Sequence, residues 1–211
     1  MKIGVIQAFS QKDKNELLYA CTRKAAEGKG YEVINFGVEK EETIPYSYVE
    51  TAVSISLLLA SGSLDFIVTG CSSGQGMMLA CNSLPGVLCG YIPTPPDAFL
   101  FGRINGGNAV SLPLGLNFGW AGEINLQCTL DELFHGTFGT GYPAQEAVRK
   151  RRDTALLKEL NRLTKKSWQD IYGGMDVELL EKVLGRKKVC DYIVRYGQEE
   201  SIRRLIENHK A

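Results

Sequence analysis

The segment FIVTGCSSGQGMMLACN, residues 66–82, decides the fold class of this 211-residue chain. An apolar run that suits a buried strand ends at Cys71, a loop of serine and glycine follows, and small residues then predict a helix. Similar apolar runs occupy residues 2–9, 31–37, 86–92 and 108–114. The segments between them have apolar residues at helical spacing and are too long for hairpins. The alternation predicts an open, doubly wound α/β domain of about five parallel strands, joined by right-handed crossovers.

The composition is that of a globular protein, with 44% hydrophobic and 23% charged residues. No apolar run reaches the roughly 18–20 residues of a membrane span, and the first residues lack the length of a signal peptide. Six cysteines lie scattered without a CxxC pair, which indicates reduced thiols. We therefore expect a cytoplasmic protein that does not bind membranes.

We divide the chain into a sheet domain, residues 1–148, and a helical extension, residues 149–211. The extension carries 16 Lys and Arg against 10 Asp and Glu. Such a surplus is typical of solvated helix faces, and without interleaved aromatic residues it predicts no nucleic-acid binding. The helices of the extension are too short and too thinly apolar for a second core. We expect them to pack on the sheet domain or on another subunit.

The loop after residue 70 is the candidate site. Cys71 falls at the carboxyl end of a predicted parallel strand, where open α/β sheets bind ligands. Gly74 and Gly76 allow the loop to direct several backbone N–H groups at one point, and the positive end of the next helix lies behind it. This arrangement stabilises a phosphate, or an oxyanion that forms beside the thiol. The alternative is a structural cysteine that merely ends a strand.

The histidine content restricts what this thiol can do. A nucleophilic cysteine usually needs a histidine partner, and the chain has only His135 and His209. A thiolate acting alone can still remove a proton beside a carbonyl, while N–H donors stabilise the enediolate. The sequence therefore favours an isomerase. A thiol-dependent hydrolase would need His135 within hydrogen-bond reach of Cys71.

Few cations are available to hold an anionic substrate. Between Lys40 and Arg149 the only Lys or Arg is Arg103, which precedes the fifth strand. The other candidates are KDK at 12–14, near the first strand, and the cluster RKRRD at 149–153, which offers Arg149 and Arg152. Arginine side chains suit phosphate because they bind it bidentately. A solvated helix start is the alternative explanation for that cluster.

These residues resemble ribose-5-phosphate isomerase B and the galactose-6-phosphate isomerase subunits. The strand–Cys–Gly-Thr-Gly-x-Gly–helix–Asn segment of that family is similar to TGCSSGQGMMLACN, residues 69–82. The resemblance assigns Cys71 to the general base and residues 72–76 to the oxyanion loop, with Ser73 keeping the hydroxyl of the family threonine. Asn82 matches the asparagine that ends the motif. NGGNAVSL, from Asn105, resembles the family segment with the enediolate-binding asparagine.

The resemblance implies a Rossmann-like three-layer fold and aldose–ketose isomerisation of a sugar phosphate, without metal or cofactor. It also implies a homodimer, or a tetramer, with active sites at the subunit interface. The expected catalytic residues are Cys71, Ser73 and Asn105. The expected substrate-binding residues are Ser72, Gly74, Gly76, Asn82, Arg103, Arg149 and Arg152.

The chain also departs from that family. The first strand leads into QAFSQKDKN, residues 7–15, which lacks the family's Asp-His pair, and Ile104 replaces the family's ring-opening histidine. A sugar phosphate that cannot cyclise, such as a tetrose 4-phosphate, needs no ring-opening acid and is one hypothesis for the substrate. Ring opening by Asp97 or by water is the other. A non-catalytic sugar-phosphate-binding protein of the same fold is the alternative to an isomerase.

Overall fold

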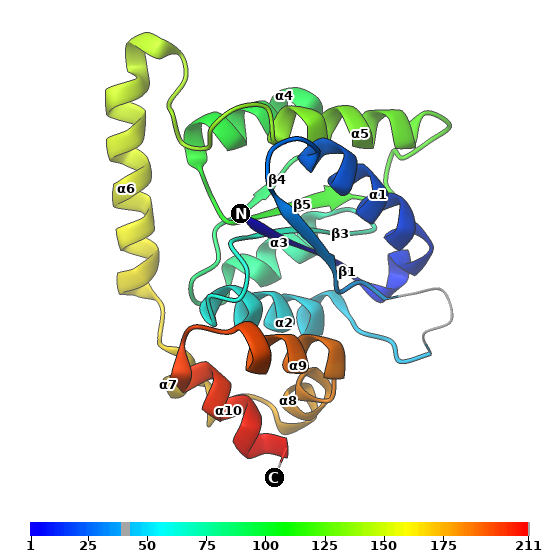
Figure 1. Cartoon of the computed structure of the whole chain (residues 1–211), viewed down its shortest axis with the longest axis vertical. Helices are drawn as coiled ribbons and strands as arrows, with labels where there is room; N and C mark the ends of the chain where they lie inside the picture. Colours follow the sequence, from blue (N-terminus) through cyan, green and yellow to red (C-terminus); the bar gives the residue numbers. More distant parts are fainter. Residues whose placement is uncertain (39–42, 211) are drawn as a thin grey trace.

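The computed structural model describes residues 1–38 and 43–210, which form an α/β fold with one parallel sheet. The strand order is β2-β1-β3-β5-β4, and each neighbouring pair is parallel (Figure 1). The strands are β1 (Lys2–Gln7), β2 (Glu32–Asn35), β3 (Phe66–Cys71), β4 (Cys89–Tyr91) and β5 (Ala109–Pro113). The predicted doubly wound, Rossmann-like α/β fold is confirmed.

Helices cover both faces of the sheet, and each face has its own buried apolar cluster. One face is covered by α1 (Asn15–Ala26), α4 (Pro95–Leu100) and α5 (Gly122–Leu133). The opposite face is covered by α2 (Tyr48–Ala60) and α3 (Gln75–Asn82). The central strands β1 and β3 are almost wholly buried, which explains why they read as continuous apolar runs.

The chain leaves β1 and β3 toward opposite faces. After β1 a 3-10 helix, Phe9–Lys14, leads into α1, whereas β3 leads into α3 on the other face. The two strands are neighbours, with Gln7 paired to Gly70. Their carboxyl ends therefore form the topological switch point of the sheet, the place where doubly wound folds bind ligands.

A capping box and a π-turn set the ends of two helices. α2 begins at Tyr48, three residues after Pro45, because Ser47 and Glu50 form a capping box in front of it. The helical segment after β4 is divided. α4 ends at Leu100, and a π-turn over Phe101–Asn105 follows, closed by the N–H of Gly106 donating to the carbonyl of Phe101 at 3.0 Å.

The last part of the chain is helical. A short 3-10 turn, Ala144–Glu146, precedes α6 (Ala147–Thr164), α7 (Trp168–Tyr172), α8 (Val177–Leu184), α9 (Lys187–Tyr196) and α10 (Glu200–Lys210). The helices α7 to α10 lie against the outer side of α2 (Figure 1), and their buried residues join the cluster on that face. Trp168 is among them, and its indole N–H donates to Ser56 of α2 at 3.1 Å. The division at residue 148 stays a prediction.

Helix α6 stands apart from the body of the molecule (Figure 1). Its described residues include none that is buried, and its leucines 156, 157, 160 and 163 are 43–64% exposed. The hydroxyl of Thr154 donates to the carbonyl of Ile104 at 2.7 Å, which fixes one point of α6 beside the π-turn. None of the helices in the described part of the chain is long and apolar enough to cross a membrane.

Candidate active site

Cys71 borders a cavity of about 530 Å³ at the switch point. Three segments line this cavity: residues 8–10 after β1, residues 45–48 at the start of α2, and residues 71–73 with Gly76. We call it the Cys71 cavity. The side chain of Cys71 is largely buried, at 8% exposure, but it belongs to the lining. The cavity therefore reaches this residue.

The loop after Cys71 places a backbone donor on the sulfur. Gly74 has φ of 76°, which is the left-handed region, and its N–H donates to Cys71 Sγ at 3.2 Å. A Cβ at position 74 would lie 2.7 Å from the Tyr91 ring and 2.9 Å from the Leu112 carbonyl carbon. The buried hydroxyl of Ser111 also donates to the carbonyl of Gly74 at 2.7 Å. Glycine is therefore required here, and the loop is held with the Gly74 N–H directed at the sulfur.

Ser72 connects this loop to the segment after β1. Gln11 donates from Nε2 to Ser72 Oγ at 2.9 Å, and the Ser72 carbonyl accepts from the N–H groups of Gly115 and Leu116. The neighbouring Ser73 has a weak contact at 3.4 Å from the N–H of Gln75 to its hydroxyl. Sequence reasoning did not select Gln11 or Ser111. The position of Gln11 just after a central strand was a usable signal, whereas Ser111 lies inside a strand and gave none.

The lining of the Cys71 cavity carries no charge of its own. The described residues that line it are uncharged, and Phe9, Tyr46 and Tyr48 give it aromatic walls. Such walls suit the apolar faces and hydroxyl groups of a small polyol. An anionic substituent of a substrate must therefore find its cations outside this lining.

Asn105 lies in a different cavity, of about 510 Å³, along the edge strand β4. Asp97, Phe101 and Leu157 line it too, so the structure brings together Asn105 and the side chain considered for ring opening. The cavity shares none of its described lining residues with the Cys71 cavity. Asn105 precedes the amino end of β5, whereas Cys71 ends β3, which is paired to β5 in parallel. The paired stretch alone separates the two ends by about 13 Å, at 3.3 Å per residue.

Asn82 lines the second cavity, but both polar atoms of its side-chain amide form hydrogen bonds to the backbone of β4. Its Nδ2 donates to the carbonyl of Cys89 at 2.8 Å, and its Oδ1 accepts from the N–H of Cys89 at 2.9 Å. The side chain thus pairs with the outer edge of β4 as a neighbouring strand would.

Arg103 lines neither of these two cavities. It is 6% exposed, donates from Nη2 to the carbonyl of Leu133 at 3.2 Å and lies over the ring of Phe138. Burial lowers the pKa of its guanidinium, although Tyr31 and Glu132 act in the opposite direction. In this position Arg103 connects the π-turn to the end of α5.

Arg149 and Arg152 lie in the first turns of α6, exposed, on the same helix as the Thr154 contact to the π-turn. Arg149 bonds Glu146 at 2.7 Å and Asp153 at 2.9 Å. The hydrogen bond to Glu146 is the main reason why the pKa of Arg149 is raised.

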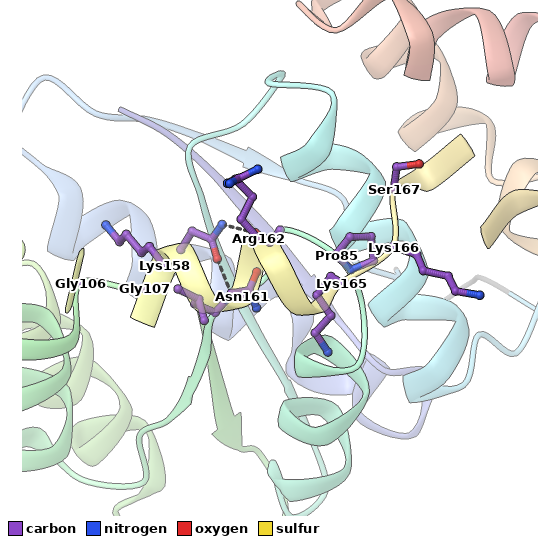
Figure 2. Close-up of a pocket in the computed structure, with 12 residues that line it drawn as sticks. Pro85, Gly106, Gly107, Lys158, Asn161, Arg162, Lys165, Lys166 and Ser167 are labelled. Atoms are coloured by element: carbon purple, nitrogen blue, oxygen red, sulfur yellow. Dashed lines mark hydrogen bonds between the residues drawn. The ribbon is translucent and has the colours of Figure 1, made fainter. Parts of the chain in front are cut away.

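Further basic side chains follow along α6. Lys158, Arg162, Lys165 and Lys166 line a cavity of about 530 Å³ with residues 106–108 (Figure 2). Figure 2 shows the ends of Lys158, Arg162 and Lys166 pointing in different directions, so these side chains do not converge on one ligand. Basic side chains therefore follow α6 on the Asn105 side of the molecule, whereas on the Cys71 side Lys12 Nζ lies 4.9 Å from the ring centroid of Phe9.

His135 does not lie with Cys71. It follows the end of α5, is exposed, and is not among the residues that line the Cys71 cavity. Among the described residues, no histidine lines the Cys71 cavity as a partner for a thiol-dependent hydrolase. In the described residues, no group of three or more His, Cys, Asp or Glu side chains is arranged to hold a metal ion.

Comparison with known proteins identifies the family. A sequence model described as Ribose/Galactose Isomerase matches residues 9–126. The chain is 36% identical to a 4-deoxy-L-threo-5-hexosulose-uronate ketol-isomerase, whose crystal structure holds a tartrate, with a TM-score of 0.93 over 99% of this chain and 98% of that one. It is 35% identical to a ribose-5-phosphate isomerase of Vibrio parahaemolyticus, with the same TM-score and coverage.

A shorter structure, a ribose 5-phosphate isomerase of Thermotoga maritima, is 24% identical with a TM-score of 0.57. It covers 75% of this chain and 97% of its own, and it supports the fold alone. No curated protein matches the chain. The two longer structures and the family match leave one conclusion: this chain is a member of the ribose/galactose isomerase family.

Proposed function

We propose that the protein isomerises a small phosphorylated sugar between its aldose and ketose forms through an enediolate, with Cys71 as the base. The observation that carries this proposal is that Cys71 lines a cavity at the switch point and that the Gly74 N–H lies 3.2 Å from its sulfur. Isomerisation needs one group that moves a proton between adjacent carbons and donors that stabilise the intermediate.

The reaction balances with these groups. The Cys71 thiolate removes the proton from C2 of the aldose, and the carbonyl electrons move onto O1 to form the enediolate. The thiol then returns the proton to C1, while the hydroxyl proton passes from O2 to O1. The backbone N–H groups of residues 72–74 stabilise the charged oxygens, and Ser73 and Asn105 add polar side chains to them.

We further propose that one active site is built from two copies of the chain. Cys71 and Asn105 lie at opposite ends of paired strands, so a small sugar cannot contact both within one copy. A partner that presents Asn105 to the Cys71 cavity would also present Asp97 and the basic side chains of α6, among them Arg149 and Arg152. The exposed leucines of α6 supply apolar surface for that contact.

Subunit mixing tests both the role of Cys71 as the base and the sharing of one active site between two copies. The variants Cys71→Ala and Asn105→Ala are each expected to lose activity when pure. After they are unfolded together and refolded in equal amounts, half of the dimers are hybrids with one intact site of two, so activity should return to about a quarter of wild type. If both residues act within one chain, mixing restores nothing. If pure Cys71→Ala keeps its activity, the thiol is not the base.

A uronate is a second candidate for the substrate, because the 36% identical structure is that of a uronate ketol-isomerase. Both candidates end in an anionic group, and the uncharged lining of the Cys71 cavity does not separate them. Turnover of erythrose 4-phosphate, ribose 5-phosphate and 4-deoxy-L-threo-5-hexosulose uronate should be compared. Clear preference for the uronate would replace the phosphate proposal. Saturable binding without deuterium exchange at C2 would indicate a non-catalytic binder.

A further inference from the structure

We propose that Arg186, in the link between α8 and α9, is a positioning residue for the Cys71 cavity. Through it the C-terminal helices take part in substrate binding, although none of their residues lines the cavity. The kinetic part of this inference rests on the function proposed above.

Arg186 contacts Tyr46, a residue of the cavity wall, but does not line the cavity itself. Its guanidinium carbon lies 4.5 Å from the ring centroid of Tyr46, and its Nη2 donates to the carbonyl of Phe36 at 2.8 Å. Arg186 is 6% exposed and Tyr46 is 5% exposed, so this contact is shielded from water. Cation–π contacts and charge-assisted hydrogen bonds are strongest under such conditions.

The wall has little regular structure of its own. Residues 45–47 precede α2 and lie outside any helix or strand. The carbonyl of Tyr46 accepts from the N–H of Phe9 at 3.0 Å, so the position of Tyr46 also affects the segment after β1. Tyr46 and Phe9 both line the cavity. A displacement of Tyr46 therefore changes two walls of the cavity.

A second contact from the same helices holds the other end of this wall. Lys182 of α8 forms an ion pair with Glu50 at 2.8 Å, and the Glu50 carboxylate also accepts from the N–H of Ser47. Arg186 and Lys182 thus act on opposite sides of Ser47. Because both come from α8 and its C-terminal link, this part of the extension sets the geometry of residues 46–50.

Arg186→Met tests the inference, with Arg186→Lys as the conservative variant and Trp168→Phe as the matched control. Trp168→Phe also removes one buried hydrogen bond between the extension and α2, but at Ser56, which does not line the cavity. We expect Arg186→Met to raise KM about tenfold with a smaller change in kcat, because the cavity loses its preformed shape. Arg186→Lys should lie between it and wild type, because it keeps the charge but loses the planar fork. Trp168→Phe should keep the wild-type KM.

A second measurement does not depend on the proposed activity. The rate of Cys71 alkylation by iodoacetamide, followed by peptide mass spectrometry, should rise in Arg186→Met and not in Trp168→Phe. Unchanged KM and alkylation in Arg186→Met, with only a lower Tm, would show a merely structural role and overturn the inference. Full activity of Cys71→Ala would instead overturn the proposed function, and the alkylation result would still decide the role of Arg186.

Discussion

Replacing Gly74 with alanine is the sharpest test of the loop geometry. Gly74 has φ of 76°, and a Cβ there would overlap the Tyr91 ring and the Leu112 backbone. The left-handed conformation costs alanine about 1–2 kcal/mol. The overlap adds about 1–3 kcal/mol, because Leu112 belongs to β5, which is paired on both sides and cannot move away. Gly74→Ala should therefore lose about 2–5 kcal/mol, which lowers Tm by about 2–4 °C for each kcal/mol.

Gly28→Ala is the matched control. Gly28 has φ of 71°, and a Cβ there meets nothing within 4 Å, so this variant carries the conformational cost alone. Thermal unfolding of both variants measures the overlap as the difference between them. Gly74→Ala must also displace the N–H that donates to Cys71 Sγ, so we expect its kcat to fall about 10²–10³-fold while Gly28→Ala stays near wild type. Equal Tm losses in the two variants, or normal turnover by Gly74→Ala, would refute the reasoning.

Three further predictions concern single side chains. Cys71→Ala should reduce kcat by about 10²-fold or more, whereas Cys128→Ala, on an exposed position of α5, should not; equal rates would contradict the role of the thiol. Asn82→Ala should lower the free energy of unfolding in urea by about 1–3 kcal/mol, because two backbone groups of β4 lose their partner; an unchanged urea midpoint would disprove this. Burial by itself raises the pKa of Glu50, but hydrogen bonds from Lys182 and Ser47 outweigh it and lower the pKa. This stabilisation is present above the ordinary pKa of a glutamate and is lost as pH falls through the lowered one, so wild type should lose more stability between about pH 5 and pH 3 than Glu50→Gln. Equal losses of unfolding free energy in wild type and Glu50→Gln, measured by urea unfolding across that range, would contradict this prediction.

Local patterns in the sequence were enough to predict the strands and helices of the sheet domain and to place the Cys71 thiol at the end of a strand. Alternating apolar runs and helical stripes predicted the parallel α/β sheet, since burial on both faces leaves a periodic trace along the chain. The loop at 72–76 could be recognised because glycine and serine mark tight turns and the preceding strand is plainly apolar. The exact helix boundaries depended on caps and turns, and the π-turn before Gly106 left no such trace.

Two of the candidate substrate-binding residues, Arg103 and Asn82, show where sequence reasoning stopped. Arg103 was selected because cations are scarce in the sheet domain, yet the structure buries it against the end of α5. Asn82 was selected from a motif, and its amide pairs with the edge of β4. In both cases the partner is a backbone group, 30 residues away for Arg103 and seven for Asn82, and the residue type alone does not reveal that pairing.

By itself, the sequence determined that this protein would be a parallel α/β fold with Cys71 at the carboxyl end of a central strand. Only the tertiary structure decided that β1 and β3 are neighbours, that Asn105 lies at the opposite end of the sheet, and that Arg186 stands behind Tyr46. The physical reason is the separation along the chain over which each kind of interaction acts. Burial and backbone preference act over a few residues and repeat along the chain, whereas strand order and side-chain contacts between distant segments arise from packing the whole chain around two apolar clusters.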